Sequence, residues 1–338
     1  MSKNIYVIVE QRDGKMLKVG LELLSEAKKL AAELGQSVVG VLMGDKVKDL
    51  GNDLFKYGAD EVVYVEDPIL KEYVTEPYTK ALTKVIQDED PEIVLYGATS
   101  IGRDLAPRVA SRIHTGLTAD CTKLTIEMDK KTNQKLLMMT RPAFGGNIMA
   151  TIVCRQYRPQ MATVRPGVME LIEDASAKVG NIREIKVDFV DADMNIKIKE
   201  IIKEEHKATD ITEAKILVSG GRGIGSPEYY DTLSELADLL GGEISSSRAN
   251  VDAGWIAKDR QVGQTGKTVR PDLYLACGIS GAIQHLAGME GSDCIIAINK
   301  NDTAPIFDVS DLGIVGDIKQ VMPKLIEAVR KYKEEQAV

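Results

Sequence analysis

The sequence predicts an α/β protein of two domains, each built around a parallel β-sheet, with additional β segments in the first domain. Three observations support this fold class. Strand-like and helix-like runs alternate over residues 5–114 and again from residue 214 onward, and a β-rich stretch separates the two regions. The length of 338 residues fits two domains of roughly 100–200 residues each. Strands separated by helices indicate parallel pairing with right-handed crossovers.

The first 114 residues show the alternation most clearly. Short apolar runs predict strands at 5–11, 37–44, 61–67 and 91–100. Apolar residues at helical spacing predict helices at 21–35, 73–90 and 102–114, and a helix or broken helix at 47–60. Gly35 is a typical helix stop signal. We expect these elements to form the sheet of the first domain and the helices that cover it.

Beyond Cys121 the pattern changes to consecutive β segments. Strands are expected within 123–129, 135–154, 160–169 and 182–189, with turns at Asn133 and at Gly145-Gly146. The next stretch, residues 191–214, is charged and poor in large apolar clusters, so we interpret it as the connector between the domains. The boundary is expected near residue 205, which gives domains of residues 1–205 and 206–338.

The second domain contains the most informative part of the chain, residues 260–317. Three strand-like runs, LYLAC, CIIAI and IFDV, are each followed by small or polar residues, and helices are expected at 228–242 and 317–336. A parallel sheet presents backbone amides and short polar side chains to a phosphate-bearing cofactor at its carboxyl edge. The sequence shows no cysteine ligand set for a metal and no evident nucleophile–base pair. Chemistry carried by a bound cofactor is therefore favoured.

Composition and charge argue against several classes of protein. Aromatic residues make up 5% of the chain and the net charge is -8, so no nucleic acid is expected as a partner. No run reaches the roughly 18 apolar residues needed to span a bilayer, and the N-terminus lacks a secretory signal, so we expect a cytoplasmic protein. The four scattered cysteines are interpreted as free, buried thiols.

The segment GGRGIG, residues 220–225, follows an expected strand and precedes an expected helix. Counting from Gly221, Ser226 stands where the third glycine of a dinucleotide-binding fingerprint belongs. A tight turn between strand and helix would explain the glycines by itself. Arg222 within the turn favours a contact with a pyrophosphate group instead. Both interpretations remain open from these residues alone.

Three further motifs each allow a structural and a functional interpretation. Arg248 follows three serines and belongs either to a capped surface turn or to a site for an electron-rich ring or an anion. The loop at 261–271 is either a plain hairpin or a close backbone approach to a planar ligand. Ser280 lies near an expected helix start, where hydroxyl and amide groups can meet a phosphate, and His285 falls within that helix.

At these residues the sequence resembles the α subunit of electron-transfer flavoproteins. The resemblance rests on SSSRANVDAGW, QVGQTGKTVRPDLYLACGISGAIQHLAGM, AINKNDTAPIF and DLGIVGD, and in the first half on YGATSIGRDLAPRVASRIHTGLTADC. Together these segments extend the resemblance over essentially the whole chain. It implies a nucleotide-hydrolase-like parallel sheet in the first domain, which contacts a β subunit. It also implies a Rossmann-like second domain that holds FAD and is capped by that subunit.

The resemblance assigns roles to individual residues of the second domain. Arg248 should lie over the isoalloxazine ring, Thr265 near flavin N5, and His285 near the flavin O2 edge. A cation about 4 Å from the reduced ring is worth up to roughly 4 kcal/mol, or on the order of 100 mV, so Arg248 and a protonated or hydrogen-bonding His285 should favour the anionic semiquinone. The remaining expected FAD-binding residues are Arg222, Gly223, Gln261, Val262, Gly263, Gln264, Gly266, Ile279, Ser280, Gly281, Ala282, Gln284, Asn299 and Asp317. Among these, Arg222 is expected on the phosphates, and Asn299 and Asp317 on the adenosine portion.

The resemblance also implies the partners. The expected function is electron transfer between NADH or dehydrogenases and acyl-CoA dehydrogenases. The segments HTGLTADC and TRPAFGGNIMATIVCRQYRPQMATVRPGVM resemble anaerobic bacterial members of the family, which favours flavin-based electron bifurcation. A second FAD or AMP and the NADH site are then expected on the β subunit, with ferredoxin or flavodoxin as a further acceptor. A simple carrier that passes electrons from acyl-CoA dehydrogenases to a quinone reductase remains the alternative. Rivals from other classes are a self-contained NAD-dependent dehydrogenase and an adenine-nucleotide sensor.

Overall fold

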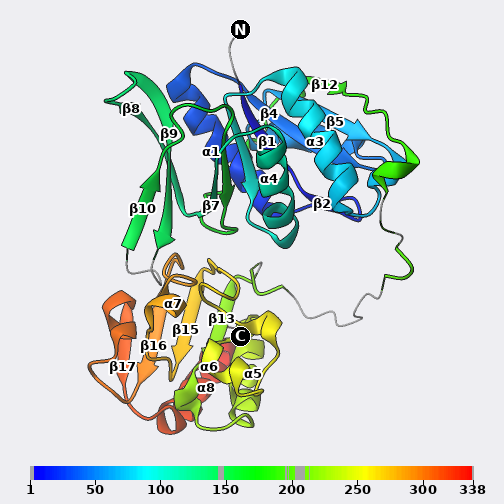
Figure 1. Ribbon diagram of the computed structural model, residues 1–338. Coiled ribbons are helices and arrows are strands. Elements are labelled where there is room, and N and C mark those ends of the chain that lie inside the picture. Colours follow the sequence, from blue (N-terminus) through cyan, green and yellow to red (C-terminus); the bar gives the residue numbers. More distant parts are fainter. Residues whose placement is uncertain are drawn as a thin grey trace. The chain divides into compact units, whose positions relative to one another are not determined.

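The computed structural model describes residues 4–143, 148–194, 196, 198–201, 210–212 and 214–336. These residues form two compact units. The described residues up to 201 make up the first unit, and those from 210 onward make up the second. Figure 1 shows a mixed α/β architecture in each. The boundary that we expected near residue 205, and the expected turn at Gly145-Gly146, lie outside the described residues.

The first unit is built on a seven-stranded parallel sheet in the order β12-β5-β4-β1-β6-β11-β7. The strands are β1 (Ile5–Ile8), β4 (Val38–Gly44), β5 (Glu61–Glu66), β6 (Ile93–Gly97), β7 (Leu117–Cys121), β11 (Gln160–Val164) and β12 (Asn181–Glu184). The chain builds outward from β1 to β4 and β5, and then crosses to β6 on the other side. The strand order therefore reverses beside β1, which is where open α/β sheets place their ligands.

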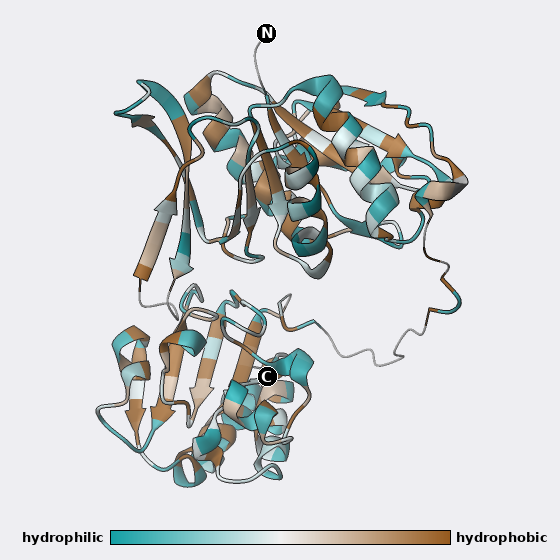
Figure 2. Ribbon diagram, in the orientation of Figure 1, coloured by the Kyte–Doolittle hydropathy of each residue, from teal (hydrophilic) through white to brown (hydrophobic). Residues whose placement is uncertain are grey.

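Helices cover both faces of this sheet. The helices are α1 (Lys18–Leu34), α2 (Gly51–Leu54), α3 (Thr75–Glu89) and α4 (Ser100–Arg112). Residues of α1 share one buried cluster with β8 and β9, whereas α3 and α4 pack on the opposite face. In β6, Ile93 and Leu95 belong to the first cluster and Tyr96 to the second, because successive side chains of a strand point to opposite faces. Figure 2 shows the resulting apolar strands between amphipathic helices.

Two β features accompany the main sheet of the first unit. One is an antiparallel sheet of β8 (Lys123–Asp129), β9 (Gln134–Ala143) and β10 (Ile148–Ile152), in which Asn133 adopts φ 53° at the turn. The other is a small hairpin of β2 (Gln11–Arg12) and β3 (Lys15–Met16). Its tip, Asp13-Gly14, has positive φ at both residues, as a two-residue hairpin turn requires. We did not predict this hairpin, although the Asp-Gly pair is its usual signal.

The second unit is a five-stranded parallel sheet in the order β14-β13-β15-β16-β17. The strands are β13 (Ile216–Gly220), β14 (Glu243–Ser246), β15 (Leu273–Cys277), β16 (Ile295–Asn299) and β17 (Leu312–Val315). The helices are α5 (Tyr229–Leu240), α6 (Arg248–Asp252), α7 (Ile283–Leu286) and α8 (Ile318–Gln336). Residues of α5 and α8 cover one face, and buried residues from loops, including Val262, Ile279 and Ile306, cover the other.

Two local predictions for the second unit were wrong. The run IFDV is not a strand but part of a 3₁₀ turn, Pro305–Val309, and the strand follows at β17. Pro305 begins this turn, and the Ile306 amide is bonded to Ser280 rather than to a sheet. The helix expected to start near Ser280 is the single turn α7, because Gly281 adopts φ 87° and interrupts it. Ser280 therefore lies in a loop.

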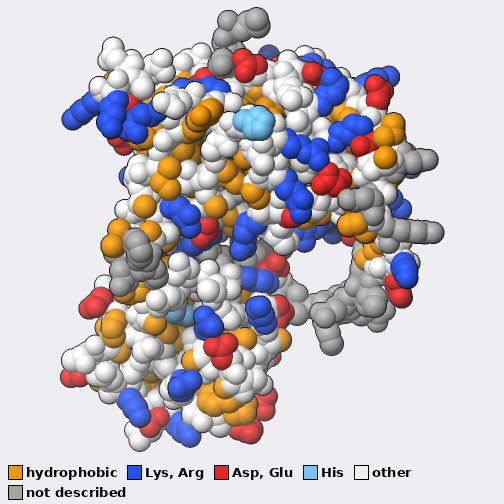
Figure 3. Space-filling model, viewed as in Figure 1, with side chains coloured by type: hydrophobic (Ala, Val, Ile, Leu, Met, Phe, Trp, Pro, Cys, Tyr) orange, Lys and Arg blue, Asp and Glu red, His pale blue; other side chains and the backbone are white. Residues whose placement is uncertain are grey.

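The surface of the molecule carries charged side chains of both signs, interspersed over the face shown in Figure 3. None of the described helices is long and apolar enough to cross a membrane. All four cysteines are free, and Cys121 and Cys277 are buried, whereas Cys154 and Cys294 are half-buried. Among the described residues, no group of histidine, cysteine and carboxylate side chains has the arrangement of a metal site.

Candidate functional site

A large cleft lies at the carboxyl edge of the sheet in the second unit. Its volume is about 900 Å³, which falls within the roughly 300–1,000 Å³ that is typical of small-molecule sites. Each of the five strands ends at it, since the residues that directly follow them line it: Gly221, Ser247, Gly278, Lys300 and Gly316. The strand order reverses between β13 and β15, so the cleft occupies the position where α/β sheets bind nucleotides.

Glycines bring two strand ends of this cleft into direct backbone contact. The amide of Gly221 donates to Cys277 O at 2.9 Å, and the amide of Gly223 donates to Gly278 O at 3.0 Å. A Cβ atom on Gly221 would lie 2.4 Å from Gly278 O, and one on Gly223 would lie 2.8 Å from the same atom. Both positions therefore exclude larger residues. The contact explains why GGRGIG needs its glycines, and it leaves bare backbone facing the cleft.

The charged side chains of the cleft are mostly cationic. Arg222, Arg248, Lys300 and Lys319 line it, against the single carboxylate of Asp317. The excess is local, because the chain as a whole carries a net charge of -8. Arg222 has no hydrogen-bond or ion-pair partner for its side chain among the described residues. Such an arrangement suits an anionic ligand, and a pyrophosphate group in particular.

Lys300 and Lys319 were missed by the sequence reasoning. Lys300 directly follows β16, and Lys319 lies in the first turn of α8, so both stand where a parallel sheet meets its ligand. The placement after a strand end could have identified Lys300. Asp317, which we did predict, caps α8 by accepting a 2.9 Å hydrogen bond from the Lys319 amide through Oδ1. Its carboxylate is thus already engaged in holding the helix start.

Arg248 and Thr265 approach the cleft from different segments. Arg248 begins α6, and its exposed guanidinium pairs with Asp252 at 3.1 Å. Thr265 accepts a 3.0 Å hydrogen bond from the Gln261 side chain. The 261–267 loop, which contains Gln261 and Thr265, is more than a plain hairpin, because the Gln264 amide also donates to Gln284 O at 2.7 Å. This bond ties the 261–267 loop to α7.

His285 lies at the buried edge of the cleft and is only 6% exposed. Its Nδ1 is 3.1 Å from Val262 O, and its Nε2 is 3.0 Å from the hydroxyl of Tyr274. Burial lowers the pKa of His285 to about 4, and the bond to Val262 opposes that shift only partly. Of the two forms that we considered, this environment favours a neutral, hydrogen-bonded imidazole over a protonated one.

Asn299 is bound within the protein. Its Nδ2 donates to Ile279 O at 2.8 Å, and its Oδ1 accepts a hydrogen bond from the Asn301 amide at 2.9 Å. The side chain thereby links the turn after β15 to the end of β16. Asn299 borders the cleft, but its amide group is used to hold two strand ends together.

All of the predicted site residues border the cleft except two glycines, Gly266 and Gly281. Gly266 packs on the backbone of its own loop, since a Cβ there would lie 2.3 Å from Gln261 O. Gly281 packs on the 305–306 backbone, where a Cβ would lie 2.2 Å from the Ile306 amide nitrogen. Both shape the loops without facing the cleft. The predicted residues that do border it are Arg222, Gly223, Arg248, Gln261, Val262, Gly263, Gln264, Thr265, Ile279, Ser280, Ala282, Gln284, His285, Asn299 and Asp317.

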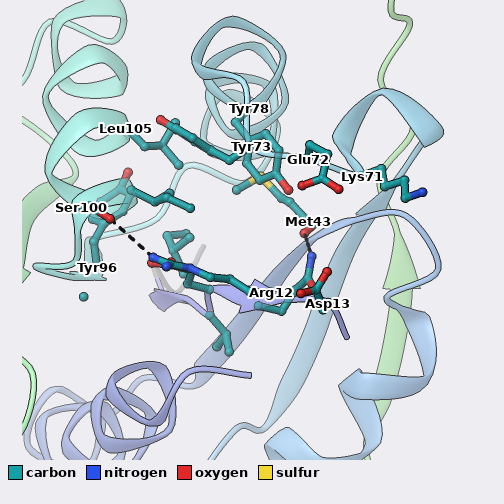
Figure 4. Close-up of a pocket in the computed structure, with 17 residues that line it drawn as sticks. Arg12, Asp13, Met43, Lys71, Glu72, Tyr73, Tyr78, Tyr96, Ser100 and Leu105 are labelled. Atoms are coloured by element: carbon teal, nitrogen blue, oxygen red, sulfur yellow. Dashed lines mark hydrogen bonds and ion pairs between the residues drawn. The ribbon is translucent and has the colours of Figure 1, made fainter. Parts of the chain in front are cut away.

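A smaller cavity of about 270 Å³ lies at the carboxyl edge of the first unit's sheet, beside β1 (Figure 4). Figure 4 shows Tyr73 and Tyr78 across the cavity from Arg12 and Asp13, which come from the β2–β3 hairpin. Some of its polar groups are paired, but the Tyr96 hydroxyl that lines it has no hydrogen-bond partner among the described residues. Arg12 pairs with Glu10 at 2.7 Å, and the Tyr73 hydroxyl donates to a carboxylate on α4 at 2.7 Å. We did not predict a site here.

Comparison with known proteins agrees with the two-unit architecture. Residues 5–190 match the family model described as "Electron transfer flavoprotein domain", and residues 210–290 match "Electron transfer flavoprotein FAD-binding domain". A relative named "Electron transfer flavoprotein subunit alpha" from Thermoanaerobacterium thermosaccharolyticum is 54% identical over 331 residues, covering 98% of this chain and 99% of its own.

Two further relatives extend the comparison. An "Electron transfer flavoprotein subunit alpha" from Clostridium acetobutylicum is 50% identical and covers 97% of each chain. An "Acryloyl-CoA reductase electron transfer subunit beta" from Anaerotignum propionicum is 47% identical and covers 98% of this chain and 96% of its own. Since two family models together span most of the chain, and full-length relatives share about half of its residues, the chain belongs to the electron transfer flavoprotein alpha subunit family.

Proposed function

We propose that this chain binds one FAD in the cleft of its second unit and works, together with a β subunit, as an electron-transferring heterodimer. The observation that carries the proposal is the cleft itself. A cavity of about 900 Å³ at the strand-order reversal is lined by four cationic side chains and by glycine turns whose backbones touch. The match of residues 210–290 to an FAD-binding family supports the same assignment.

The residues present fit FAD in both charge and shape. The pyrophosphate of a dinucleotide needs cations, which Arg222 and Lys319 offer, and a close approach to the backbone, which the glycine turn at Gly221–Gly223 allows. The flavin ring needs a flat, glycine-containing approach, which the 261–267 loop offers. Gly263 in this loop has φ 138° and packs against α7, because a Cβ there would lie 2.8 Å from Gln284 O.

FAD, when bound, would supply the one- and two-electron chemistry, and the chain's residues would determine which redox state of the flavin is favoured. Arg248 would place positive charge against the ring and favour reduced flavin. Thr265, oriented by Gln261, would offer a hydroxyl to the ring edge. His285 would contribute a neutral imidazole that is held in place by Tyr274 and the Val262 carbonyl. No general base is required, because the task is to store and pass electrons.

We further propose that the heterodimer serves in flavin-based electron bifurcation. NADH would give up two electrons at a site on the β subunit, which would carry a second FAD. One electron would pass to an acyl-CoA dehydrogenase and the other to a low-potential acceptor such as ferredoxin or flavodoxin. The relative named as an electron transfer subunit of an acryloyl-CoA reductase supports a partner that acts on acyl-CoA. A carrier that passes electrons from acyl-CoA dehydrogenases to a quinone reductase is the alternative.

One experiment tests both levels of the proposal. The chain is co-expressed with its β subunit, and the flavin content of the heterodimer is measured from its absorption spectrum and by chromatography after release. The proposal predicts flavin in the heterodimer, and bifurcation predicts two per heterodimer. Anaerobic mixing with NADH, an acyl-CoA dehydrogenase and ferredoxin should then reduce ferredoxin only when an α,β-unsaturated acyl-CoA, which the dehydrogenase can reduce, is present. A colourless heterodimer would overturn the FAD assignment, and unreduced ferredoxin would leave the simple carrier.

A self-contained NAD-dependent dehydrogenase is not favoured by the structure. Ser226 departs from the third glycine of the dinucleotide fingerprint, and the preceding strand is followed by a 3₁₀ turn, Arg222–Ile224, before α5 begins. The backbone contact of this turn with Gly278 explains its glycines without that fingerprint. An adenine-nucleotide sensor would need a site in the first unit, where the cavity beside β1, at about 270 Å³, is smaller than the roughly 300–1,000 Å³ that is typical of small-molecule sites.

A further inference from the structure

A cluster of buried polar side chains adjoins the two turns that carry the arginines of the cleft. Its members are Tyr230 near the start of α5, Ser246 at the end of β14 and Asn250 in α6. Their exposed fractions are 7%, 0% and 1%, and none of the three lines the cleft. They surround the carbonyl oxygen of Gly220, the last residue of β13. The cluster thus joins four elements of the second unit and lies outside the cleft itself.

Asn250 contributes two donors to this cluster. Its Nδ2 donates to Gly220 O at 3.2 Å and to the Tyr230 hydroxyl at 2.9 Å. A carbonyl oxygen can only accept, so the contact with Gly220 fixes which end of the amide group faces it. The Tyr230 and Ser246 hydroxyls lie 2.5 Å apart, and Ser246 Oγ has Gly220 O and Ser247 O as acceptors, each at 3.1 Å. Both donors of the Asn250 side chain are therefore used within the cluster.

This orientation of the Asn250 amide has a cost. With Nδ2 bonded to Gly220 and Tyr230, Oδ1 is buried and has no hydrogen-bond partner among the described residues. A buried acceptor without a partner is unfavourable, and an apolar side chain of similar shape would avoid that cost. We infer from the retained bonds of Nδ2 that Asn250 serves the position of the chain more than its stability.

The helix that bears Arg248 has few other means of keeping its place. Helix α6 is only five residues long, Arg248–Asp252, which is too short for a helix to be stable by itself. Ser247 at its N-cap makes no side-chain hydrogen bond to it within the described residues. Of the five residues, all of which the structure describes, Asn250 alone is buried. The Asn250 side chain is thus the anchor that attaches α6 to the sheet.

The anchor point also belongs to the turn that carries the other cleft arginine. Gly220 is followed by Gly221 and Arg222, and its carbonyl oxygen accepts a further hydrogen bond from the Ser247 amide at 3.1 Å. Both turns are therefore tied to one backbone oxygen. A displacement of α6 would move Arg248 relative to Arg222 within the cleft that both line.

We propose that Asn250 is a positioning residue that holds Arg248 at the cleft, with Gly220 O and the Tyr230 hydroxyl as its two anchor points. The proposal rests on the function proposed above, because a bound flavin is the group on which the position of Arg248 would act. A guanidinium that moves freely in water is screened, whereas one held against a ligand exerts its full charge on that ligand. Asn250 would thus act on the flavin potential through Arg248, without contact with the flavin.

The test compares Asn250→Leu with wild type in the heterodimer with the β subunit. Leucine keeps the branched shape of asparagine but forms no hydrogen bonds. Amide hydrogen exchange of residues 247–252, followed by mass spectrometry, should become faster. The ratio of reduced to oxidised flavin at a given potential, measured by spectroelectrochemistry, should fall roughly two- to threefold. Tyr230→Phe leaves the bond to Gly220 O in place, so it should show smaller changes of both kinds, and it serves if Asn250→Leu does not fold.

A second substitution shows whether Asn250 acts through Arg248. In Arg248→Ala the guanidinium is gone, so the addition of Asn250→Leu should not lower the flavin potential further. A shift of the same size with and without Arg248 would overturn the proposal. Ser292→Ala is the control, because it removes a hydroxyl of the same unit that donates to Met289 O at 2.6 Å and does not line the cleft. Its hydrogen exchange over 247–252 and its flavin potential should match those of wild type.

The outcomes separate this inference from the proposed function. A heterodimer that never contains flavin would contradict the proposed function, and the exchange of residues 247–252 would still show whether Asn250 anchors α6. In a flavin-loaded heterodimer, an unchanged potential in both Asn250→Leu and Tyr230→Phe would overturn only the positioning role. Unchanged exchange of residues 247–252 in Asn250→Leu would overturn it as well.

Discussion

Both units of this chain place a cavity at the carboxyl edge of a parallel sheet, beside the strand where the order reverses. In the first unit the cavity is about 270 Å³, and the β2–β3 hairpin contributes Arg12 and Asp13 to its lining. Its arginine is paired with Glu10. In the second unit the cleft is about 900 Å³, and Arg222 has no partner within the described residues. The same topology thus provides a place in both, but the cleft gathers four cations against one carboxylate, whereas two cations and three carboxylates line the smaller cavity.

Glycines make close backbone contacts at both edges. In the second unit, Gly221 and Gly223 touch Gly278 so closely that neither can carry a side chain, and their amides are bonded to Cys277 O and Gly278 O. In the first unit, Thr99 Oγ1 accepts from the Gly102 amide at 2.9 Å, and a Cβ on Gly102 would lie 1.9 Å from Gly97 O. The two edges therefore differ in the volume and the charge of their cavities, which topology alone does not decide.

The largest effect is expected from Gly221→Ala. The new Cβ would lie 2.4 Å from Gly278 O and 2.7 Å from Ile279 Cγ1, and the backbone atom cannot move aside. We expect a loss of roughly 2–3 kcal/mol of unfolding free energy and of most of the bound flavin. The unfolding free energy is measured by urea unfolding, followed by the fluorescence of Trp255, the single tryptophan. The bound flavin is measured by its absorbance.

Gly241→Ala controls for the loss of a glycine. Gly241 has φ 71°, and no atom lies within 4 Å of its added Cβ, so this variant carries only the strain of a left-handed alanine, about 1 kcal/mol. It should keep its flavin. Equal loss of flavin from both variants would show that the contact at Gly278 is not what forms the site.

The second expected effect is a loss of stability in acid through His285. Burial lowers the pKa of this imidazole to about 4 from the ordinary value of 6.5. Between these values the unfolded chain binds a proton that the folded chain does not, so stability falls as the pH drops through this window. The loss for this group alone is at most about 3 kcal/mol. It is measured as the difference in unfolding free energy between pH 7 and pH 4, followed at Trp255.

Carboxylates titrate in the same window, so the variant His285→Gln is needed as the reference. Its unfolding free energy should fall less than that of wild type over the same range of pH. Parallel curves for the two proteins would mean that His285 is no more buried in solution than in an unfolded chain, and they would also remove the basis for its neutral resting state.

The third expected effect is a shift of flavin potential in Arg248→Ala. The guanidinium is 65% exposed and is paired with the similarly exposed Asp252, so solvent screens it in the chain by itself. A bound flavin ring would cover it and strengthen its field. We expect the flavin potential to fall by on the order of 50–100 mV, which spectroelectrochemistry can measure. Arg330→Ala removes an exposed cation on α8 and should leave the flavin potential unchanged. A shift of equal size in Arg330→Ala would point to the net charge of the protein as the cause.

Much of the second unit could be predicted because its signals are local. The strand ends, the glycine turn and the basic loop positions follow one another directly in sequence, and the fixed geometry of a parallel sheet brings them to one edge. Ser280 was misplaced because one positive φ at Gly281 stops the helix, and such a torsion has no clear signal in a glycine-rich run. The partner contacts of Asn299 and His285 join segments far apart in the chain, which no local pattern encodes.

The smallest effect should come from Arg12→Ala in the first-unit cavity. Arg12 is 50% exposed and paired with Glu10, and its guanidinium lies 3.5 Å from Ser100 Oγ at the start of α4. An exposed pair of this kind contributes about 0–1 kcal/mol, so the unfolding free energy followed by circular dichroism should change by no more than that. The flavin content of the heterodimer should not change. Loss of flavin from Arg12→Ala would mean that this edge also takes part in binding, and that the small volume and mixed charge of its cavity do not exclude a ligand.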